Sequence, residues 1–433
     1  MTAGLIRAIH ARRVWDSRGR PTVEAEVTLA DGARGRAIVP AGASRGTREA
    51  LELRDGGERF GGLDVLRAVD NVNGEIARAL VGTAADDQAA LDARLIALDP
   101  APAKSRIGAN ATLAVSMAAA HAVAAARRLP LYASLGGAGA TLLPMPQIQI
   151  FGGGAHAGRR VDVQDFMVVC PAAASFAQAL EWTAEVYRCA GALMQSRGSR
   201  FGVADEGGWW PDFATNEQAL QTLAAAIERA GFEPGRQIAI ALDIAASEFG
   251  RGGRYTLGLE RRELDADGLI ELLLRWIDTY PIASIEDPLA EDDPEGFARF
   301  TRAAGGRVQI VGDDFLVSHT PLVQQAAAIG AANTVLLKPN QRGTLTETLQ
   351  AWQAARACGY AGIVSARSGE TEDTTIVDLA IGWQVGQLKV GSFARGERMA
   401  KWNAALRIEE RLGARARFAG AAVFGRNPGA PTR

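Results

Sequence analysis

Three short apolar runs in the second half of the chain carry acidic residues at their ends. The runs IAIALD, ASIED and QIVGDD bring Asp243, Glu286 and Asp313, which are separated by about one strand–helix unit each. Neighbouring strand ends converge, so three carboxylates would meet there and repel one another. Mg²⁺ suits such oxygen ligands, whereas a zinc site would normally include Cys or His. The alternative is neutralisation by nearby arginines.

The next run, TVLLKPN, ends in a lysine in a chain that otherwise prefers arginine. Its only lysines are Lys104, Lys338, Lys389 and Lys401. Buried beside a metal ion, the Lys338 ammonium is expected to have a lowered pKa and to act as a general base, which arginine cannot do. Glu206, in the Gly-rich segment VADEGG, is the matching candidate general acid. By itself, that segment is also typical of an ordinary turn.

Two further strand ends and one loop offer groups that could bind a substrate. Arg367, Ser368 and Lys389 supply a guanidinium fork, a hydroxyl and a point charge, which suit a phosphate and a carboxylate. His156 lies in GGGAHAG (152–158), a segment that indicates a flexible lid rather than a dinucleotide-binding turn. These groups together predict proton removal beside a metal-bound carboxylate, followed by acid-assisted loss of a hydroxyl group.

The elements that would position these residues divide the chain into two parts. Residues 1–140 read as an α+β cap, with a strand over 22–29 and helices near 63–81, 86–97 and 109–127. The segment Gly136 to Leu143 is rich in Gly and Ala and is the expected boundary.

Residues 141–433 alternate short β-branched runs with Ala/Leu-rich helical stretches. The six clearest runs cover 238–243, 283–287, 309–314, 334–340, 362–368 and 387–392. Repeated strand–helix units of this kind favour a parallel sheet closed into a (β/α)8-type barrel, whose active site lies at the carboxyl ends of the strands. The predicted fold class is therefore α/β, with an N-terminal α+β cap before the barrel.

Composition limits the remaining possibilities. The 433 residues carry a net charge of −2, which argues against nucleic acid or an anionic membrane as the main partner. Three scattered cysteines indicate a reducing, cytoplasmic setting, and the first residues do not resemble a secretory signal. The apolar run at 109–126 contains Asn, Thr, Ser and His and is expected to be a buried helix rather than a membrane span.

Long motifs along the whole chain resemble those of the enolase (phosphopyruvate hydratase) family. The most specific are DSRGRPTVEAEV (16–27), LDIAASEF (242–249), SIEDP (284–288), LLKPNQRGTLTET (336–348) and RSGETED (367–373). The resemblance implies a cap followed by a barrel of atypical strand order, usually as a homodimer. It also implies reversible, Mg²⁺-dependent dehydration of 2-phospho-D-glycerate, a small phosphorylated anion, to phosphoenolpyruvate.

Matched motif by motif, the resemblance also implies a role for each site residue. Asp243, Glu286 and Asp313 would bind the first Mg²⁺, and Ser44 would help bind a second that arrives with substrate. Lys338 would be the base and Glu206 the acid. Arg367 and Ser368 would bind the phosphate and Lys389 the carboxylate, while His156, Gln164 and Asp165 would complete the pocket.

The chain departs from the family pattern around this pocket. Ala366 replaces a histidine of the motif SHRSGET, Asp165 replaces a glutamate, and Ala155 and Arg45 are further changes. A hydrogen bond to a charged group contributes about 1.5–3 kcal/mol, so these changes could slow the reaction or alter the substrate. Two alternatives therefore stay open: a paralogue acting on a related phosphonate or phosphorylated acid, as carboxyphosphonoenolpyruvate synthases do, and a non-catalytic binding scaffold.

Extra arginines near the expected lids bear on the first alternative. Arg45, Arg159 and Arg160 would suit a more anionic ligand, or they could be ordinary solvated surface residues.

Overall fold

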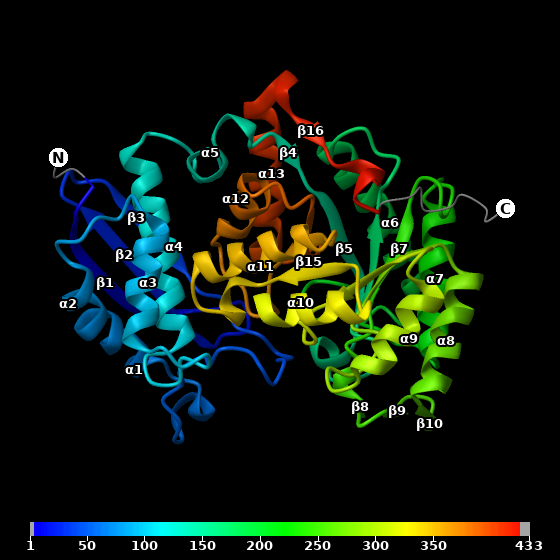
Figure 1. Ribbon diagram of the computed structural model, residues 1–433. Coiled ribbons are helices and arrows are strands. Elements are labelled where there is room, and N and C mark those ends of the chain that lie inside the picture. Colours follow the sequence, from blue (N-terminus) through cyan, green and yellow to red (C-terminus); the bar gives the residue numbers. More distant parts are fainter. Residues whose placement is uncertain (1–3, 425–433) are drawn as a thin grey trace.

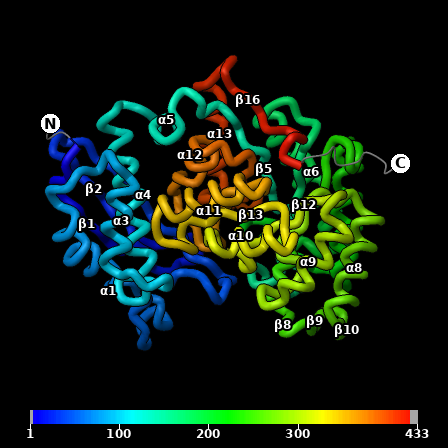
Figure 2. The backbone as a smooth tube through the Cα atoms, in the orientation of Figure 1, coloured from blue at the N-terminus to red at the C-terminus, as the bar shows by residue number. Residues whose placement is uncertain are grey.

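The computed structural model describes residues 4–424 (Figures 1 and 2). Residues 1–3 of the predicted cap and residues 425–433 of the predicted barrel lie outside the described part. An N-terminal sheet-and-helix unit packs beside a barrel surrounded by helices, and Figure 1 shows the two parts side by side. The predicted cap-and-barrel architecture is therefore confirmed.

The N-terminal unit is built on a three-stranded antiparallel sheet of order β1-β2-β3, with bounds β1 (Ile6–Trp15), β2 (Pro21–Leu29) and β3 (Arg34–Ile38). The strand predicted over 22–29 is β2, whereas β1 was not predicted. The long helix α4 (Ala109–Ala126) covers this sheet. A Cβ built on Gly35 would lie 2.1 Å from the α4 backbone, so glycine on the strand and alanines on the helix permit very close packing.

Helix α4 is the buried helix that the sequence predicted. By length and composition α4 could cross a membrane, but 83% of its 18 residues are buried inside the structure, as in a core helix. The remaining helices of this unit are α1 (Leu66–Asn71), a π-turn (Val72–Ile76), α2 (Ala77–Leu80), α3 (Gln88–Leu98) and α5 (Leu131–Gly136). The helix predicted at 63–81 is thus interrupted by a π-turn, and the one predicted at 86–97 is α3.

Eight strands form a closed barrel of order β11-β12-β13-β14-β15-β5-β6-β7. Their bounds are β5 (Met145–Gly152), β6 (Asp165–Val169), β7 (Ala239–Asp243), β11 (Ile282–Glu286), β12 (Gln309–Gly312), β13 (Thr334–Leu337), β14 (Ala361–Ser365) and β15 (Gln387–Ser392). The six predicted runs are β7 and β11 to β15, and they pair with one another in parallel. Strand β6 is antiparallel to β5 and β7, an exception to the repeated parallel units that the sequence predicted.

Five of the eight described helices around the barrel begin at a capping side chain. The eight helices are α6 (Phe176–Ser196), α7 (Asn216–Arg229), α8 (Ala266–Thr279), α9 (Pro294–Ala304), α10 (Thr320–Ile329), α11 (Leu345–Ala357), α12 (Thr375–Gly382) and α13 (Gly396–Leu412). Ser175, Thr215, Asp265, Asp293 and Thr344 each accept a backbone N–H of the helix that follows. Such caps satisfy donors that the first turn leaves free.

Two short additions complete the barrel. A hairpin-like sheet of β8 (Gly250–Arg251), β9 (Arg254–Leu257) and β10 (Arg262–Asp265) follows β7. At the other end of the barrel, β16 (Arg417–Phe418) pairs with β4 (Leu142–Leu143).

Alternation along each strand determines what the barrel interior contains. Side chains two residues apart share one face, so Ala239 and Ala241 lead to Asp243 on β7, and Leu336 leads to Lys338 beyond β13. The alanines belong to an apolar cluster low in the barrel, and Leu336 belongs to a second one with Val311 and Ile363. Ionisable side chains therefore follow the apolar layers at the carboxyl ends of the strands, as is usual in barrels.

Candidate active site

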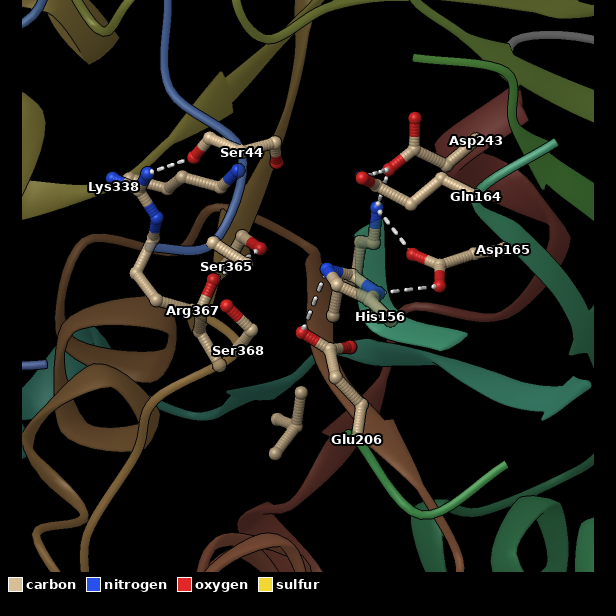
Figure 3. Close-up of a pocket in the computed structure, with 14 residues that line it drawn as sticks. Ser44, His156, Gln164, Asp165, Glu206, Asp243, Lys338, Ser365, Arg367 and Ser368 are labelled. Atoms are coloured by element: carbon tan, nitrogen blue, oxygen red, sulfur yellow. Dashed lines mark hydrogen bonds and ion pairs between the residues drawn. The ribbon is translucent and has the colours of Figure 1, made fainter. Parts of the chain in front are cut away.

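A pocket at the mouth of the barrel brings together nearly all the predicted site residues (Figure 3). It is lined by Ala43, Ser44, His156, Gln164, Asp165, Glu206, Asp243, Lys338, Ser365, Ala366, Arg367, Ser368, Lys389 and Val390. In Figure 3, Lys338 and Arg367 face Asp243 and His156 across this space. Glu286 and Asp313 lie beneath it and contact the two lysines of the pocket.

Lys389 neutralises two of the three predicted metal-binding acids. Its Nζ donates to Asp243 Oδ2 at 2.7 Å and to Glu286 Oε2 at 2.9 Å, and lies 3.2 Å from Asp165 Oδ2. Burial alone would lower the pKa of Lys389, but these carboxylates outweigh it and raise the pKa well above its usual range. Asp243 and Glu286 therefore share one cationic partner, which is a lysine rather than an arginine.

The third acid, Asp313, pairs with Lys338. Lys338 Nζ donates to Asp313 Oδ2, and Gln341 Nε2 donates to Asp313 Oδ1 at 2.8 Å. The backbone N–H of Asp313 also donates to the carboxylate of Asp287 at 2.9 Å, which fixes the end of β12 against that of β11. Each oxygen of the Asp313 carboxylate thus has a donor, and the residue is held from three directions.

The lowered pKa expected for Lys338 applies to a lysine beside a metal ion and stays a prediction, because the protein groups alone shift the pKa in the opposite direction. Burial does lower the pKa, but the nearby carboxylates of Asp313 and Glu286 outweigh it, so the pKa of Lys338 is raised. The same pairing lowers the pKa of Asp313, although burial opposes that effect. An ammonium beside a free carboxylate is stabilised in its charged form.

The acids also have unsatisfied oxygen atoms. Burial and the neighbouring Asp243 raise the pKa of Glu286 well above its usual range. Among the described residues, Glu286 Oε1 and Gln164 Oε1 are buried without a hydrogen-bond partner. Buried oxygens with free lone pairs and repelling carboxylates are the ligands that a hard cation such as Mg²⁺ prefers, so this residue set fits the predicted metal.

His156 joins Glu206 to Asp165 on the other side of the pocket. Its Nδ1 lies 3.3 Å from Asp165 Oδ1 and its Nε2 lies 3.7 Å from Glu206 Oε1. Burial lowers the pKa of His156, but Glu206 and Asp165 outweigh burial and raise it. His156 thus lies between the candidate acid and Asp165, and the shorter Asp165 remains part of the network.

The candidate phosphate ligands lie at the end of β14. Arg367 Nη1 donates to Glu49 Oε2 at 3.0 Å, and its Nη2 donates to the Ser44 carbonyl at 2.8 Å. Ser368 Oγ accepts a 3.1 Å bond from Arg18 Nη1. The guanidinium therefore joins the barrel to the N-terminal loop that carries Ser44, while Arg367 and Ser368 both line the pocket.

The extra arginines lie outside the pocket lining of the described chain. Arg45 pairs with Glu52, Arg159 Nη2 contacts Glu248 at 2.8 Å, and Arg160 Nη2 contacts Asp212 at 2.5 Å. All three arginine side chains are exposed. In this arrangement they are solvated surface residues, which is the second of the two interpretations that the sequence allowed.

Sequence reasoning missed several groups that hold the site together. Gln149 Nε2 donates to Asp165, and Gln149 Oε1 accepts the Gly208 N–H at 2.9 Å. Gln341 and Glu49 fix Asp313 and Arg367. The alternating glutamines of the segment QIQ on β5 were a usable signal, because a buried polar residue at every second position indicates an interior polar face.

Comparisons with known proteins agree with this arrangement. The family model described as "Enolase, N-terminal domain" matches residues 6–135, and "Enolase, C-terminal TIM barrel domain" matches residues 140–427. A curated protein named Enolase from Acidothermus cellulolyticus is 50% identical over 425 residues, covering 98% of this chain and 99% of the relative.

Proposed function

Because the chain belongs to the enolase family and is a phosphopyruvate hydratase-like carbon–oxygen lyase, we propose that it catalyses the reversible dehydration of 2-phospho-D-glycerate to phosphoenolpyruvate. One observation carries the proposal: Lys338 and Glu206 are both buried and line the same pocket, which also contains acidic side chains. A base and an acid beside one substrate are the requirement for removing a proton and a hydroxyl from adjacent carbons.

Each residue has a distinct proposed task. Lys338 Nζ takes the proton from the carbon next to the substrate carboxylate, and Glu206 delivers a proton to the departing hydroxyl. Arg367 and Ser368 bind the phosphate, and Lys389 binds the carboxylate. His156, Gln164 and Asp165 position the leaving group and the candidate acid, to which His156 is already connected.

The proposal includes Mg²⁺ at the acid cluster. Asp243, Glu286 and Asp313 would hold the first ion, and Ser44 would help hold a second that arrives with substrate. When bound, Mg²⁺ supplies positive charge beside the substrate carboxylate and so makes the neighbouring proton easier to remove. A cation on Asp313 would also offset the negative charge that favours the charged form of Lys338.

Three proposals concern the whole chain. We propose that residues 1–140 and 141–433 are the two domains, that the protein acts as a homodimer or larger homo-oligomer, and that it works in the cytoplasm. Size-exclusion chromatography with light scattering would test the second of these, and a single species at the mass of one chain would contradict it.

A related phosphorylated or phosphonate acid remains the second candidate substrate. Ala366, which lines the pocket, favours this candidate, because the family motif has a histidine there. An alanine leaves space and removes a donor, and sites discriminate strongly between ligands that do and do not satisfy their buried polar groups.

Turnover of 2-phospho-D-glycerate with Mg²⁺, followed by phosphoenolpyruvate absorbance, tests the proposal. We expect ordinary enzyme rates, and in Lys338→Ala a fall in kcat of about 10²–10⁴-fold, because the base is lost. Lys104→Met removes a buried lysine outside the pocket and should leave kcat unchanged. Trace turnover with tight ligand binding would favour the second candidate substrate, and no turnover without Mg²⁺-dependent ligand binding would favour a scaffold.

A further inference from the structure

Helix α13 buries two cations directly behind the candidate phosphate ligands. The side chains of Arg398 and Lys401 are both 0% exposed, and their spacing of three residues places them on one face of the helix. Burying a cation is costly unless it gains strong partners. The partners of these two therefore indicate what the burial achieves.

Arg398 holds the backbone of two strand ends that carry proposed substrate ligands. Its Nη1 donates to the carbonyls of Arg367 at 2.7 Å and Val390 at 2.8 Å, and its Nη2 donates to the Ser368 carbonyl at 2.5 Å. Val390 follows Lys389 directly. One guanidinium thus binds the backbone carbonyls of both candidate phosphate ligands and of the residue that follows the candidate carboxylate ligand.

Lys401 fixes the same segment one turn further on. Its Nζ donates to the Thr371 carbonyl at 2.8 Å and lies 2.9 Å from Glu370 Oε2. Glu370 Oε1 in turn accepts the backbone N–H of Arg367 at 3.2 Å. The two cations therefore reach the segment 367–371 at both ends.

The charge of Arg398 is only weakly compensated among the described residues. Its Nη donors bond carbonyls, and its buried Nε has no hydrogen-bond partner. Glu397 Oε1 lies 3.4 Å from that Nε but accepts a 2.9 Å bond from Arg395. Because Glu397 is shared with Arg395, it compensates the Arg398 charge only in part, and the remaining positive potential at the pocket wall is strengthened by the low polarity around it.

A glycine makes room for this arrangement. A Cβ on Gly391, which has a φ of +115°, would lie 3.0 Å from Arg398 Cδ and 3.0 Å from the Glu206 carbonyl. Arg398 therefore packs close to the loop of the candidate acid through the only residue type that fits.

We propose that Arg398 and Lys401 are positioning residues of the anion subsite, holding segment 367–371 in its binding geometry and adding positive potential behind the bound phosphate group. This rests on the proposed function in one respect, the assignment of Arg367 and Ser368 to phosphate. Neither cation lines the pocket, so both act through the segment that they hold.

The test compares Arg398→Lys and Lys401→Met with Lys104→Met. Lys104 is also fully buried and paired with a carboxylate, Glu347 at 2.9 Å, but it lies outside the pocket lining. Calorimetry with Mg²⁺ measures the Kd for inorganic phosphate and for phosphoenolpyruvate, and steady-state kinetics measures KM and kcat separately. Thermal melting reports folding in each variant.

We expect Arg398→Lys and Lys401→Met to raise both Kd values and KM about tenfold or more, with a much smaller change in kcat. Lys401→Arg should restore much of the affinity, because it keeps the charge and the donors. Lys104→Met should lower the melting temperature and leave both Kd values within twofold of the wild type.

Two results would overturn the proposal. One is folded Arg398→Lys and Lys401→Met variants whose Kd values stay within twofold of wild type. The other is loss of cooperative melting in both, which would make the cations purely structural. Failure of the proposed function looks different: the wild-type protein would bind inorganic phosphate without converting 2-phospho-D-glycerate, and the Kd comparison would still test the two cations.

Discussion

The floor and the mouth of the barrel contain opposite chemistry. The floor is an apolar cluster formed by Met145, Met167, Val169, Ala239, Ala241 and Ala283, with Phe418, Val423 and Phe424 packed against it. The mouth contains the buried carboxylates of Asp165 on β6, Asp243 on β7 and Glu286 on β11, together with the ammonium groups of Lys338 after β13 and Lys389 on β15. Stability and function are thereby separated along the strand direction. Burial of apolar side chains in the floor stabilises the folded state, whereas desolvation of charged groups in the mouth destabilises it.

Removing the cation shared by the mouth acids should have the largest effect on stability. Lys389→Met leaves Asp243 and Glu286 without the ammonium that contacts both, and breaking a buried pair typically costs about 3–5 kcal/mol. We expect the free energy of unfolding in EDTA to fall by that amount, and Mg²⁺ to recover most of it by binding the same acids. Urea unfolding with EDTA and with Mg²⁺ measures both quantities.

Lys104→Met is the matched control for this comparison. It should also destabilise the protein, because Glu347 loses its buried partner, but Mg²⁺ should not recover the loss. Equal recovery in both variants would mean that Mg²⁺ stabilises the fold generally rather than by replacing Lys389.

A cavity in the floor should produce the converse result. Met145 is fully buried at the start of β5, and truncation of a buried methionine to alanine typically costs about 2–5 kcal/mol. We expect Met145→Ala to lower the free energy of unfolding within that range while kcat and KM stay within twofold of wild type. Ile329→Ala, at an exposed position, should change stability by less than about 0.5 kcal/mol. A large loss of activity in folded Met145→Ala would contradict the separation of floor and mouth.

Much of this separation was visible in the sequence. Apolar runs ending in Asp243, Asp313 and Lys338 predicted both the strands and the clustering, because period-two alternation and parallel closure leave few other places for those side chains. Residues whose side chains act locally at strand ends are therefore the easiest to predict.

Other features depended on tertiary contacts that no local pattern encodes. The segment DFMVV of β6 is buried throughout, so its sequence does not indicate its direction. The described connection 153–164 contains only a short 3₁₀ turn, and the absence of a helical pattern there was the available signal for an antiparallel strand. The lysine pairing of the acids and the roles of Arg398 and Gln341 depend on contacts between distant segments.

A half-buried carboxyl group that forms no ion pair with the described residues extends the comparison to a third region. Asp378 Oδ1 accepts the Tyr132 N–H at 3.0 Å, between α12 and α5, and burial raises the pKa of Asp378 to about 7. The folded state then holds its proton more tightly than the unfolded state, so its contribution is fully present below about pH 4 and is lost as the pH rises through about 7. Because Asp378 is only partly buried by surface area, solvent reduces the effect, and we expect the free energy of unfolding to fall by roughly 1–2 kcal/mol over this pH range.

Asp378→Asn should remove this pH dependence. An amide oxygen can still accept the Tyr132 N–H without carrying charge, so the variant should be more stable than wild type at about pH 8 and similar to it at about pH 4. Urea unfolding at both pH values measures the difference. An unchanged pH profile would show that Asp378 is solvated well enough to ionise normally.

The rim of the mouth should show the smallest effects. Arg159 and Arg160 are exposed and form ion pairs with the half-buried Glu248 and Asp212, and pairs at the surface typically contribute less than about 1 kcal/mol. We therefore expect Arg159→Ala and Arg160→Ala to change the free energy of unfolding by less than that amount and KM by less than twofold, as unfolding curves and kinetics would show. A tenfold rise in KM would instead mean that an arginine of the loop beside His156 contacts the ligand. That result would favour a more anionic substrate than 2-phospho-D-glycerate. It would also mean that this loop, and not only the strand ends, contributes to ligand binding.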